Sequence, residues 1–258
     1  MIKKIKTVCN WLLSPVCLEI HRRGSDANWQ RKVVQLNDEL SMFRFQKKNK
    51  ELWIKQLSLQ TIIDVGANLG QFSLEMRRLL PEVNIYAFEP LPDCFARLEA
   101  AFSGDRHFQA FNMGLGDASG AMGFDRNQFS ASSSFLEKTD AHIEAFPFTA
   151  NTSKEMVKIE RLDNVMKGID IISPFMLKID VQGFEEQVLR GGEATARNAN
   201  IILLETSFVE LYRQQPLFND IYALLIDWGF DYQGSFEQLR DPGTGITVQE
   251  DSVFVRHK

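Results

Sequence analysis

The stretch that most constrains the fold of this chain runs from residue 61 to residue 90. Residues 61–65 form a short apolar run rich in β-branched side chains, typical of a strand buried on both faces of a parallel sheet. Residues 71–80 carry apolar side chains at helical spacing, and Pro81 ends that pattern. A second strand is predicted over 83–88. This order predicts one βαβ unit of an open α/β sheet.

The turn inside this unit predicts a ligand site. It reads Asp64-x-Gly66-Ala67-Asn68-x-Gly70, and glycine lets a backbone approach a ligand closely. We therefore expect a side chain at Gly66 to block the ligand while leaving the chain folded. At the tip of the second predicted strand, Glu89 can accept two hydrogen bonds from a ribose diol. The candidate cofactor-binding residues of this unit are Asp64, Gly66, Ala67, Asn68, Gly70, Glu89 and Pro90.

The charge of the turn indicates which cofactor it binds. A pyrophosphate site usually carries G-x-G-x-x-G, whereas here an acid precedes the first glycine and Asn68 replaces the second. Asp64 would repel a pyrophosphate but suits a cationic ligand with an ammonium and a sulfonium. This favours S-adenosylmethionine over a nicotinamide cofactor. The alternative is a parallel-sheet turn that binds no ligand.

A third strand is predicted over 108–113, and its tip should lie beside the adenine of such a cofactor. Met113 is expected to cover the ring, and Asp117 to accept a hydrogen bond from the exocyclic amine. For Asp117 the alternative is a simple turn into the next strand, because glycines surround it.

Candidate catalytic residues follow two later strands, predicted over 175–179 and 201–204. Lys178 and Asp180 alternate onto one side of the first strand, and Glu205 stands at the tip of the second. Open α/β sheets place their ligands at this carboxyl edge. These three residues are therefore expected to act on an acceptor hydroxyl. The structural alternative is an ion-pair group with Glu185 that shapes the turn.

Two mechanisms would activate that hydroxyl. In the first, Asp180 or Glu205 is the general base, and Lys178 steadies the charge that develops. In the second, Asp180 and Glu205 hold a divalent metal such as magnesium, manganese or calcium. A metal site would need a third oxygen ligand, from Thr206 or from residues 127–152. For want of that ligand the metal-free mechanism is favoured.

The remaining strands complete the expected sheet. Strands are predicted over 229–234 and 251–255, joined by a glycine-rich loop as in a hairpin, which gives seven strands of which the last is antiparallel. The chain is read as a domain of residues 59–258 with an N-terminal helical extension, 1–58. Residues 127–152 break the pattern with serines and aromatics, and we expect a lid or substrate loop there. His142 within it is either a general base or, as we favour, an exposed helix residue.

Composition limits the partners and the setting. A net charge of −5 and a pI near 5.5 argue against a nucleic-acid partner. Three cysteines make no even disulfide framework and fit the reducing cytoplasm. Basic residues precede an apolar run over 8–18, which is too short to span a membrane. It is expected to form a helix that packs on the domain or, less favoured, makes a peripheral membrane contact.

Several motifs in order resemble the FkbM family of S-adenosylmethionine-dependent methyltransferases. The matching segments are Ile63-Asp64-Val65-Gly66-Ala67-Asn68-x-Gly70, Phe88-Glu89-Pro90, Leu115-Gly116-Asp117, Arg161-Leu162-Asp163, Leu177-Lys178-Ile179-Asp180-Val181-Gln182-Gly183-Phe184-Glu185, Val188-Leu189-Arg190-Gly191-Gly192 and Glu205. Together they cover roughly residues 60–208. Many members have Glu where this chain has Gln182.

The resemblance implies a Rossmann-like class I methyltransferase fold and O-methylation of a sugar, a glycan or a polyketide-type product. Its partner would be a small-molecule or glycan acceptor, and the oligomeric state is left open. Substrate choice is expected to lie in the first 55 residues and in the insertion, where no family motif is found. The competing classes are a nicotinamide-dependent oxidoreductase and a non-catalytic Rossmann-like binding protein.

Overall fold

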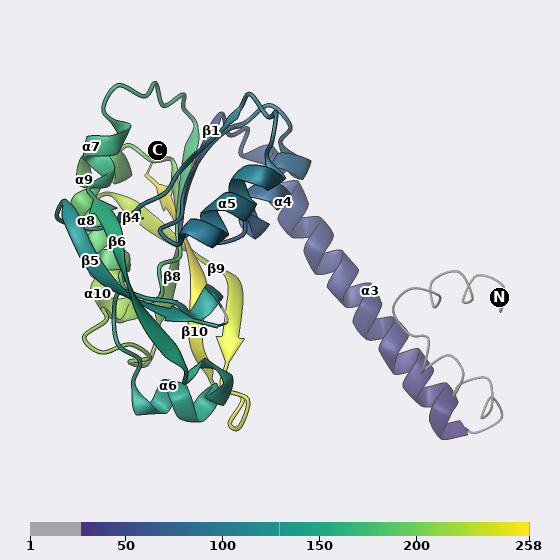
Figure 1. Cartoon of the computed structure of the whole chain (residues 1–258). Coiled ribbons are helices and arrows are strands. Elements are labelled where there is room, and N and C mark those ends of the chain that lie inside the picture. The colour runs from purple at the N-terminus through teal and green to yellow at the C-terminus, as the bar shows by residue number, and fades with distance from the viewer. Residues whose placement is uncertain (1–26, 129, 258) are drawn as a thin grey trace. The chain divides into compact units, whose positions relative to one another are not determined.

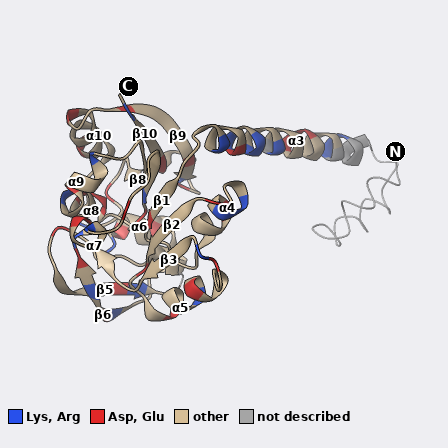
Figure 2. Cartoon of the chain, turned by 90° about the horizontal axis from the view of Figure 1, so that it is seen from above, with Lys and Arg blue, Asp and Glu red and all other residues tan. Residues whose placement is uncertain are grey.

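The computed structural model describes residues 27–128 and 130–257. Contacts divide the chain into two units, Met1–Trp53 and Ile54–Lys258. The predictions for residues 1–26, including the apolar run over 8–18, lie outside the described residues. Within the predicted extension, helix α3 (Ala27–Gln56) is 30 residues long, and Figure 2 shows basic and acidic residues interspersed along it. No helix in the described part of the chain is long and apolar enough to cross a membrane.

A seven-stranded sheet forms the centre of the second unit (Figure 1). Its strands are β1 (Thr61–Val65), β2 (Asn84–Phe88), β3 (Phe108–Phe111), β7 (Phe175–Ile179), β8 (Ile201–Ser207), β9 (Phe230–Arg240) and β10 (Thr247–Arg256). They lie in the order β3-β2-β1-β7-β8-β10-β9. The first five are parallel, and β10 is antiparallel to both of its neighbours. The predicted sheet, with its antiparallel last strand, is confirmed.

Helices connect the parallel strands and cover both faces of the sheet, as such crossovers require (Figure 1). On one face lie α4 (Gln71–Leu79) and α5 (Pro92–Ala101). The other face carries α8 (Glu185–Gly191), α9 (Glu193–Ala196) and α10 (Phe218–Asp227), and a short helix, α7 (Leu162–Met166), precedes β7. The helix predicted over 71–80 is therefore present, within one residue of its expected end.

The middle of the sheet explains why its strands read as apolar runs. Every residue of β1 and of β7 is buried. Asp64 and Lys178 are the charged residues of these two strands, and they are partners in the parallel register. A buried charge needs a partner of opposite sign, so the strand pairing itself brings the two together.

A second, three-stranded sheet was not predicted. It consists of β4 (Gly114–Leu115), β5 (Gly120–Asn127) and β6 (Thr152–Glu160) in the order β4-β6-β5. The predicted insertion over 127–152 connects β5 to β6 and contains α6 (Asp140–Ala145) with two short 3-10 turns, Ser130–Ser132 and Pro147–Thr149.

The structure corrects the interpretation of His142. Its side chain is buried, not exposed, and its ring packs edge-on against Phe146 and Tyr212. Burial and the nearby Lys138 lower the pKa of His142 to about 4. The residue does not line the cavity described below, so a role as the general base there is not supported either.

Candidate functional site

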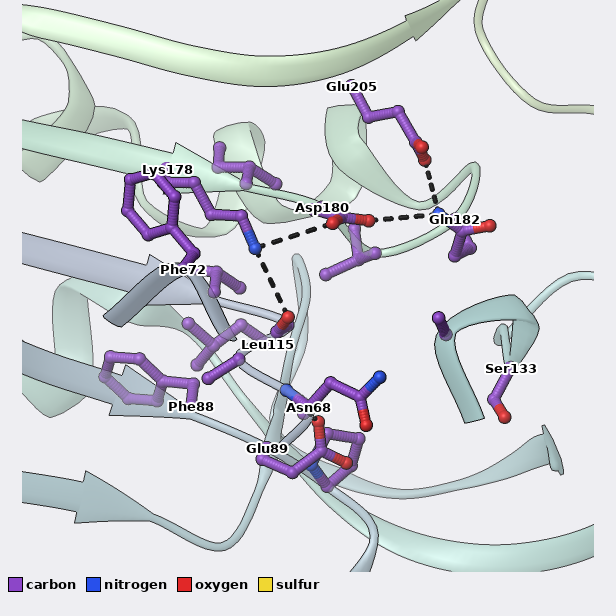
Figure 3. Close-up of a pocket in the computed structure, with 18 of the residues that line it drawn as sticks. Asn68, Phe72, Phe88, Glu89, Leu115, Ser133, Lys178, Asp180, Gln182 and Glu205 are labelled. Atoms are coloured by element: carbon purple, nitrogen blue, oxygen red, sulfur yellow. Dashed lines mark hydrogen bonds and ion pairs between the residues drawn. The ribbon is translucent and has the colours of Figure 1, made fainter. Parts of the chain in front are cut away.

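A cavity of about 370 Å³ lies at the carboxyl ends of the parallel strands. The ends of β1 and β2 form one part of its wall, and the ends of β7 and β8 form another. The insertion contributes Ser130, Ala131, Ser133 and Phe135. Further wall residues come from the β9–β10 hairpin. Figure 3 shows Glu89 and Asn68 at one end of this site and Asp180, Gln182 and Glu205 at the other.

Glu89 defines the first end. Its two carboxylate oxygens accept hydrogen bonds from the backbone N–H groups of Asn68, at 2.9 Å, and Leu91, at 2.8 Å. Asn68 has a left-handed backbone, with φ of 49°, which turns its N–H toward Glu89. Burial raises the pKa of Glu89 to about 7 against the opposing effect of these two hydrogen bonds. A carboxyl group of this kind is poised to lose its proton when hydroxyl donors arrive.

Six of the nine predicted cofactor-binding residues line the cavity. They are Gly66, Ala67, Asn68, Glu89, Pro90 and Met113. The other three do not line it. Asp117 is exposed, so its predicted contact with an adenine amine has no support in this geometry. Gly70 is buried, and a side chain there would meet Leu98 at 2.8 Å, which makes its role one of packing.

The expectation for Gly66 is wrong in its physical reason. Its φ is 79°, and an added Cβ would lie 1.8 Å from the backbone oxygen of Asp180. The close approach that requires glycine is therefore between two loops of the protein. A side chain at this position would disturb the fold before it met a ligand.

Asp64 is also corrected. It has no exposed surface, and one carboxylate oxygen lies 3.0 Å from Lys178 Nζ. The other accepts a hydrogen bond of 2.6 Å from the hydroxyl of Ser73. A carboxylate held in this way cannot meet the cofactor directly. Its charge acts on the site through Lys178.

Lys178 lies at the centre of the charged groups. Besides Asp64, its Nζ lies 3.5 Å from Asp180 Oδ2, donates to the backbone oxygen of Gly66 at 3.3 Å, and sits 5.6 Å from the ring centre of Phe72. Burial opposes its charge, but Asp64 and Asp180 outweigh burial and raise the pKa of Lys178. The residue is therefore a permanent cation that faces the cavity beside Asp180.

The predicted catalytic residues are brought together. Asp180 directly follows β7, and Glu205 lies within β8, just beyond Leu204, the last β8 residue that pairs with β7. The amide of Gln182 lies between the two carboxyl groups (Figure 3). Its Nε2 donates to Asp180 Oδ1 at 3.0 Å and to Glu205 Oε2 at 2.6 Å. Burial, followed by the charges of Asp180, Glu185 and Asp251, raises the pKa of Glu205 well above its usual value. The ionised form of Glu205 is therefore disfavoured in this site.

Glu185, the structural alternative, has a separate task. Its carboxylate accepts hydrogen bonds from the N–H groups of Val181 and Gly183, both at 3.1 Å, and so holds the loop after β7. Burial raises its pKa to about 7. Lys178 and Asp180 line the cavity, whereas Glu185 supports the loop from beneath.

Sequence reasoning missed a wall of the cavity. Phe236 and Glu237 of β9 and Asp251 of β10 line it. Asp251 is the register partner of Glu205 across the antiparallel β10–β8 pair. No local motif marks these positions, and only the pairing of the last strand with β8 brings them to the site.

The residues present fit S-adenosylmethionine. Glu89 is a buried carboxylate suited to a diol, and Phe88, Met113 and Leu115 provide an apolar wall beside it for an adenine ring. The backbone turn of Gly66 and Ala67 borders the same cavity. For the alternative metal site, no cluster of three His, Cys, Asp or Glu residues able to hold an ion occurs among residues 27–128 and 130–257. The donor hydrogens of Gln182 point at both proposed metal ligands.

Comparisons with known proteins agree on one family. The family model for the methyltransferase FkbM domain matches residues 64–232. Methyltransferase sdnD of Sordaria araneosa is 30% identical over 198 residues, which cover 66% of this chain and 73% of that protein. The 2-O-methyltransferase NoeI of Sinorhizobium fredii is 26% identical over 171 residues, covering 64% and 70%. The hexuronic acid methyltransferase AglP of Haloferax volcanii is 22% identical over 217 residues, covering 80% and 82%.

Proposed function

Since this chain belongs to the FkbM family of methyltransferases, we propose that it transfers a methyl group from S-adenosylmethionine to a hydroxyl of a sugar, a glycan or a sugar-containing metabolite. The observation that carries this proposal is the meeting of Lys178, Asp180 and Glu205 in the cavity that also holds Glu89. The names of two relatives, a 2-O-methyltransferase and a hexuronic acid methyltransferase, support a hydroxyl acceptor of sugar type.

The protein's residues have two tasks in this reaction. The cofactor, when bound, supplies a methyl group already activated by the positive charge of its sulfur. The protein must position the acceptor and manage the proton of its hydroxyl. Glu89, Asn68 and the turn at Gly66 would hold the ribose and orient the cofactor. This leaves the other end of the cavity for the acceptor.

Asp180 is the better general base of the carboxylate pair. Burial and nearby carboxylates raise the pKa of Glu205 and so disfavour its ionised form, whereas Asp180 Oδ2 lies 3.5 Å from the Lys178 ammonium. Asp180 would take the proton of the acceptor hydroxyl, and Lys178 would steady the developing negative charge on the oxygen.

The acceptor would lie against the wall formed by the hairpin and the insertion. An aromatic ring from Phe236 and another from Phe135 offer surfaces against which a sugar can stack. The carboxylates of Glu237 and Asp251 and the hydroxyl of Ser133 offer partners for sugar hydroxyls. The hairpin part of this wall, Phe236, Glu237 and Asp251, lies beyond residue 232, where the family match ends. The proposal includes a cytoplasmic setting, supported by the cysteine count and by a free, buried Cys94.

The test is formation of S-adenosylhomocysteine from S-adenosylmethionine with nucleotide sugars, lipid-linked glycans and polymer glycans as acceptors. We expect acceptor-dependent turnover that Asp180→Asn abolishes. Asp227→Asn, at an exposed position on α10, is the matched control and should be fully active. Turnover that does not depend on any acceptor, or that survives in Asp180→Asn, would overturn the proposal.

A chelator separates the two activation mechanisms. Activity that persists in EDTA supports the simple base. Activity lost in EDTA and restored by magnesium or manganese would assign Asp180 and Glu205 to a metal instead. Turnover with a polyketide-type product and none with sugars would keep the reaction but change the acceptor class.

A further inference from the structure

The side chain of Gln182 lies between the carboxyl groups of Asp180 and Glu205 and donates a hydrogen bond to each. We propose that Gln182 is a positioning residue that holds Asp180 and Glu205 in register with each other, and that Tyr212 sets the direction of its amide. The importance of this arrangement for methyl transfer rests on the proposed function. The arrangement itself rests on the hydrogen bonds of the described residues.

The backbone at Gln182 is unusual. Its φ is 56°, in the left-handed region that few side chains other than those of glycine and asparagine adopt. Gly183 beside it has φ of 97°. A turn of two such residues directs the Gln182 side chain back toward Asp180. Local strain is retained in proteins where the surroundings impose it, often at functional sites.

The side-chain amide of Gln182 donates both of its hydrogens to the carboxyl groups of Asp180 and Glu205. A glutamine side chain has two N–H donors and one carbonyl acceptor. Both donors come from one nitrogen, and they reach Asp180 from β7 and Glu205 from β8. Carboxyl groups in such positions would otherwise repel one another when ionised or rotate independently. The planar amide therefore fixes the positions of the two carboxyl groups relative to each other.

Tyr212 decides which way the amide faces. Its hydroxyl donates a 2.7 Å hydrogen bond to Gln182 Oε1. If the amide were flipped, its oxygen would face two carboxyl groups, and the phenol would face the amide N–H group. The ring of Tyr212 has no exposed surface, and burial together with Glu205, Glu185 and Asp180 raises the pKa of its phenol. The phenol therefore stays protonated and keeps its donor.

The insertion holds both members of this pair. The hydroxyl of Ser134 donates to the backbone oxygen of Gln182 at 2.6 Å. The ring of His142 packs edge-on against Tyr212, with 5.0 Å between ring centres. Lys138 Nζ lies 5.9 Å from the centre of the Tyr212 ring. The segment expected to choose the substrate thus also supports the residues that orient the catalytic carboxyl groups.

Tyr212→Phe removes only the hydroxyl that orients the amide. Tyr222→Phe is the matched control, because Tyr222 is a partly exposed tyrosine on α10 that does not line the cavity. In protein labelled with ¹⁵N-glutamine, the side-chain signal of Gln182 is assigned by its loss in Gln182→Met. We expect its hydrogen exchange to be slow in the wild type and in Tyr222→Phe, and at least about tenfold faster in Tyr212→Phe.

Kinetics complete the test. Tyr212→Phe and Gln182→Met should each lower kcat by about tenfold or more, while the Kd for S-adenosylhomocysteine stays close to that of the wild type. Unchanged amide exchange in Tyr212→Phe would overturn the role of Tyr212. Unchanged kcat in Gln182→Met would overturn the role of Gln182. If Tyr212→Phe fails to fold, the kcat of Gln182→Met is the measurement that tests the proposal. If the wild type transfers no methyl group, the proposed function fails, and the exchange measurement still decides the geometry.

Discussion

Binding of the cofactor should depend on pH through Glu89, and Glu89→Gln should remove that dependence. Glu89 is 5% exposed, and burial raises its pKa to about 7. Near neutral pH a large share of the unliganded protein therefore carries a proton on Glu89. A ribose diol donates two hydrogen bonds and so favours the ionised form, which must first be generated.

The size of the effect follows from this pKa. With a pKa of about 7, the ionised fraction rises from about 0.1 at pH 6 to about 0.9 at pH 8. If the ligand binds the ionised form alone, its Kd falls by about tenfold over this range, or about 1.4 kcal/mol. The contribution to folding has the opposite sign. Because folding raises the pKa of Glu89, this group favours the folded, ligand-free protein when the pH is below the pKa of the unfolded chain. That contribution to stability is lost as the pH rises through 7.

Calorimetry with S-adenosylhomocysteine at pH 6, 7 and 8, in buffers of different ionisation enthalpy, measures both the Kd and the protons released. The wild type should bind more tightly as pH rises and release a proton at pH 6. Glu89→Gln should bind more weakly and with no slope. Glu99→Gln, at an exposed position on α5, is the control and should follow the wild type. A flat wild-type profile, or an equal slope in Glu89→Gln, would refute the reasoning.

Three further perturbations follow from the geometry. Gly66→Ala should lower the free energy of unfolding, measured in urea, by about 3 kcal/mol or more, because the added Cβ would lie 1.8 Å from the backbone oxygen of Asp180. A loss below about 1 kcal/mol would contradict this prediction. Lys178→Met leaves Asp64 charged and buried without its ion pair, so urea unfolding should show a loss of about 3–5 kcal/mol at pH 7, and unchanged stability would contradict the pair. Phe236→Ala should raise the KM for the acceptor by about tenfold with an unchanged Kd for S-adenosylhomocysteine. An unchanged KM would remove Phe236 from the acceptor wall.

Much of the fold could be predicted because the buried strands are short apolar runs. The runs over 61–65 and 175–179 became β1 and β7, and the residues directly after them reached the same edge of the sheet. That rule is enough to bring Glu89 and Asp180 to one cavity, and Glu205 reaches it from within β8, just beyond the residues that pair with β7. Local sequence predicts the position of a residue correctly where that position depends only on where its own strand ends.

The remaining features depend on pairing between distant segments. The Asp64–Lys178 ion pair follows from the register of β1 against β7, so Asp64 could not be told from a ligand-facing acid by its motif alone. Asp251 reaches Glu205 because β10 enters the sheet between β8 and β9. The hydrogen bond of Tyr212 to Gln182 joins two loops that are 30 residues apart. No periodicity within one segment carries such information.

His142 shows a different limit. It lies on a helix of six residues, and so short a helix has too few turns for its buried face to be read from spacing. The small sheet of β4, β5 and β6 was missed for another reason: it depends on Gly114 and Gly120 both pairing with Ile159, far along the chain, and a local pattern does not show which strands pair.

The most direct test of the central claim is the intact mass of the acceptor after incubation with S-adenosylmethionine carrying a deuterated methyl group. With the wild-type protein we expect an acceptor heavier by one labelled methyl group, together with an equal amount of S-adenosylhomocysteine. With Asp180→Asn we expect unmodified acceptor and undiminished binding of S-adenosylhomocysteine. Methylation that is unaffected by Asp180→Asn, or S-adenosylhomocysteine formed without any change in acceptor mass, would contradict the claim.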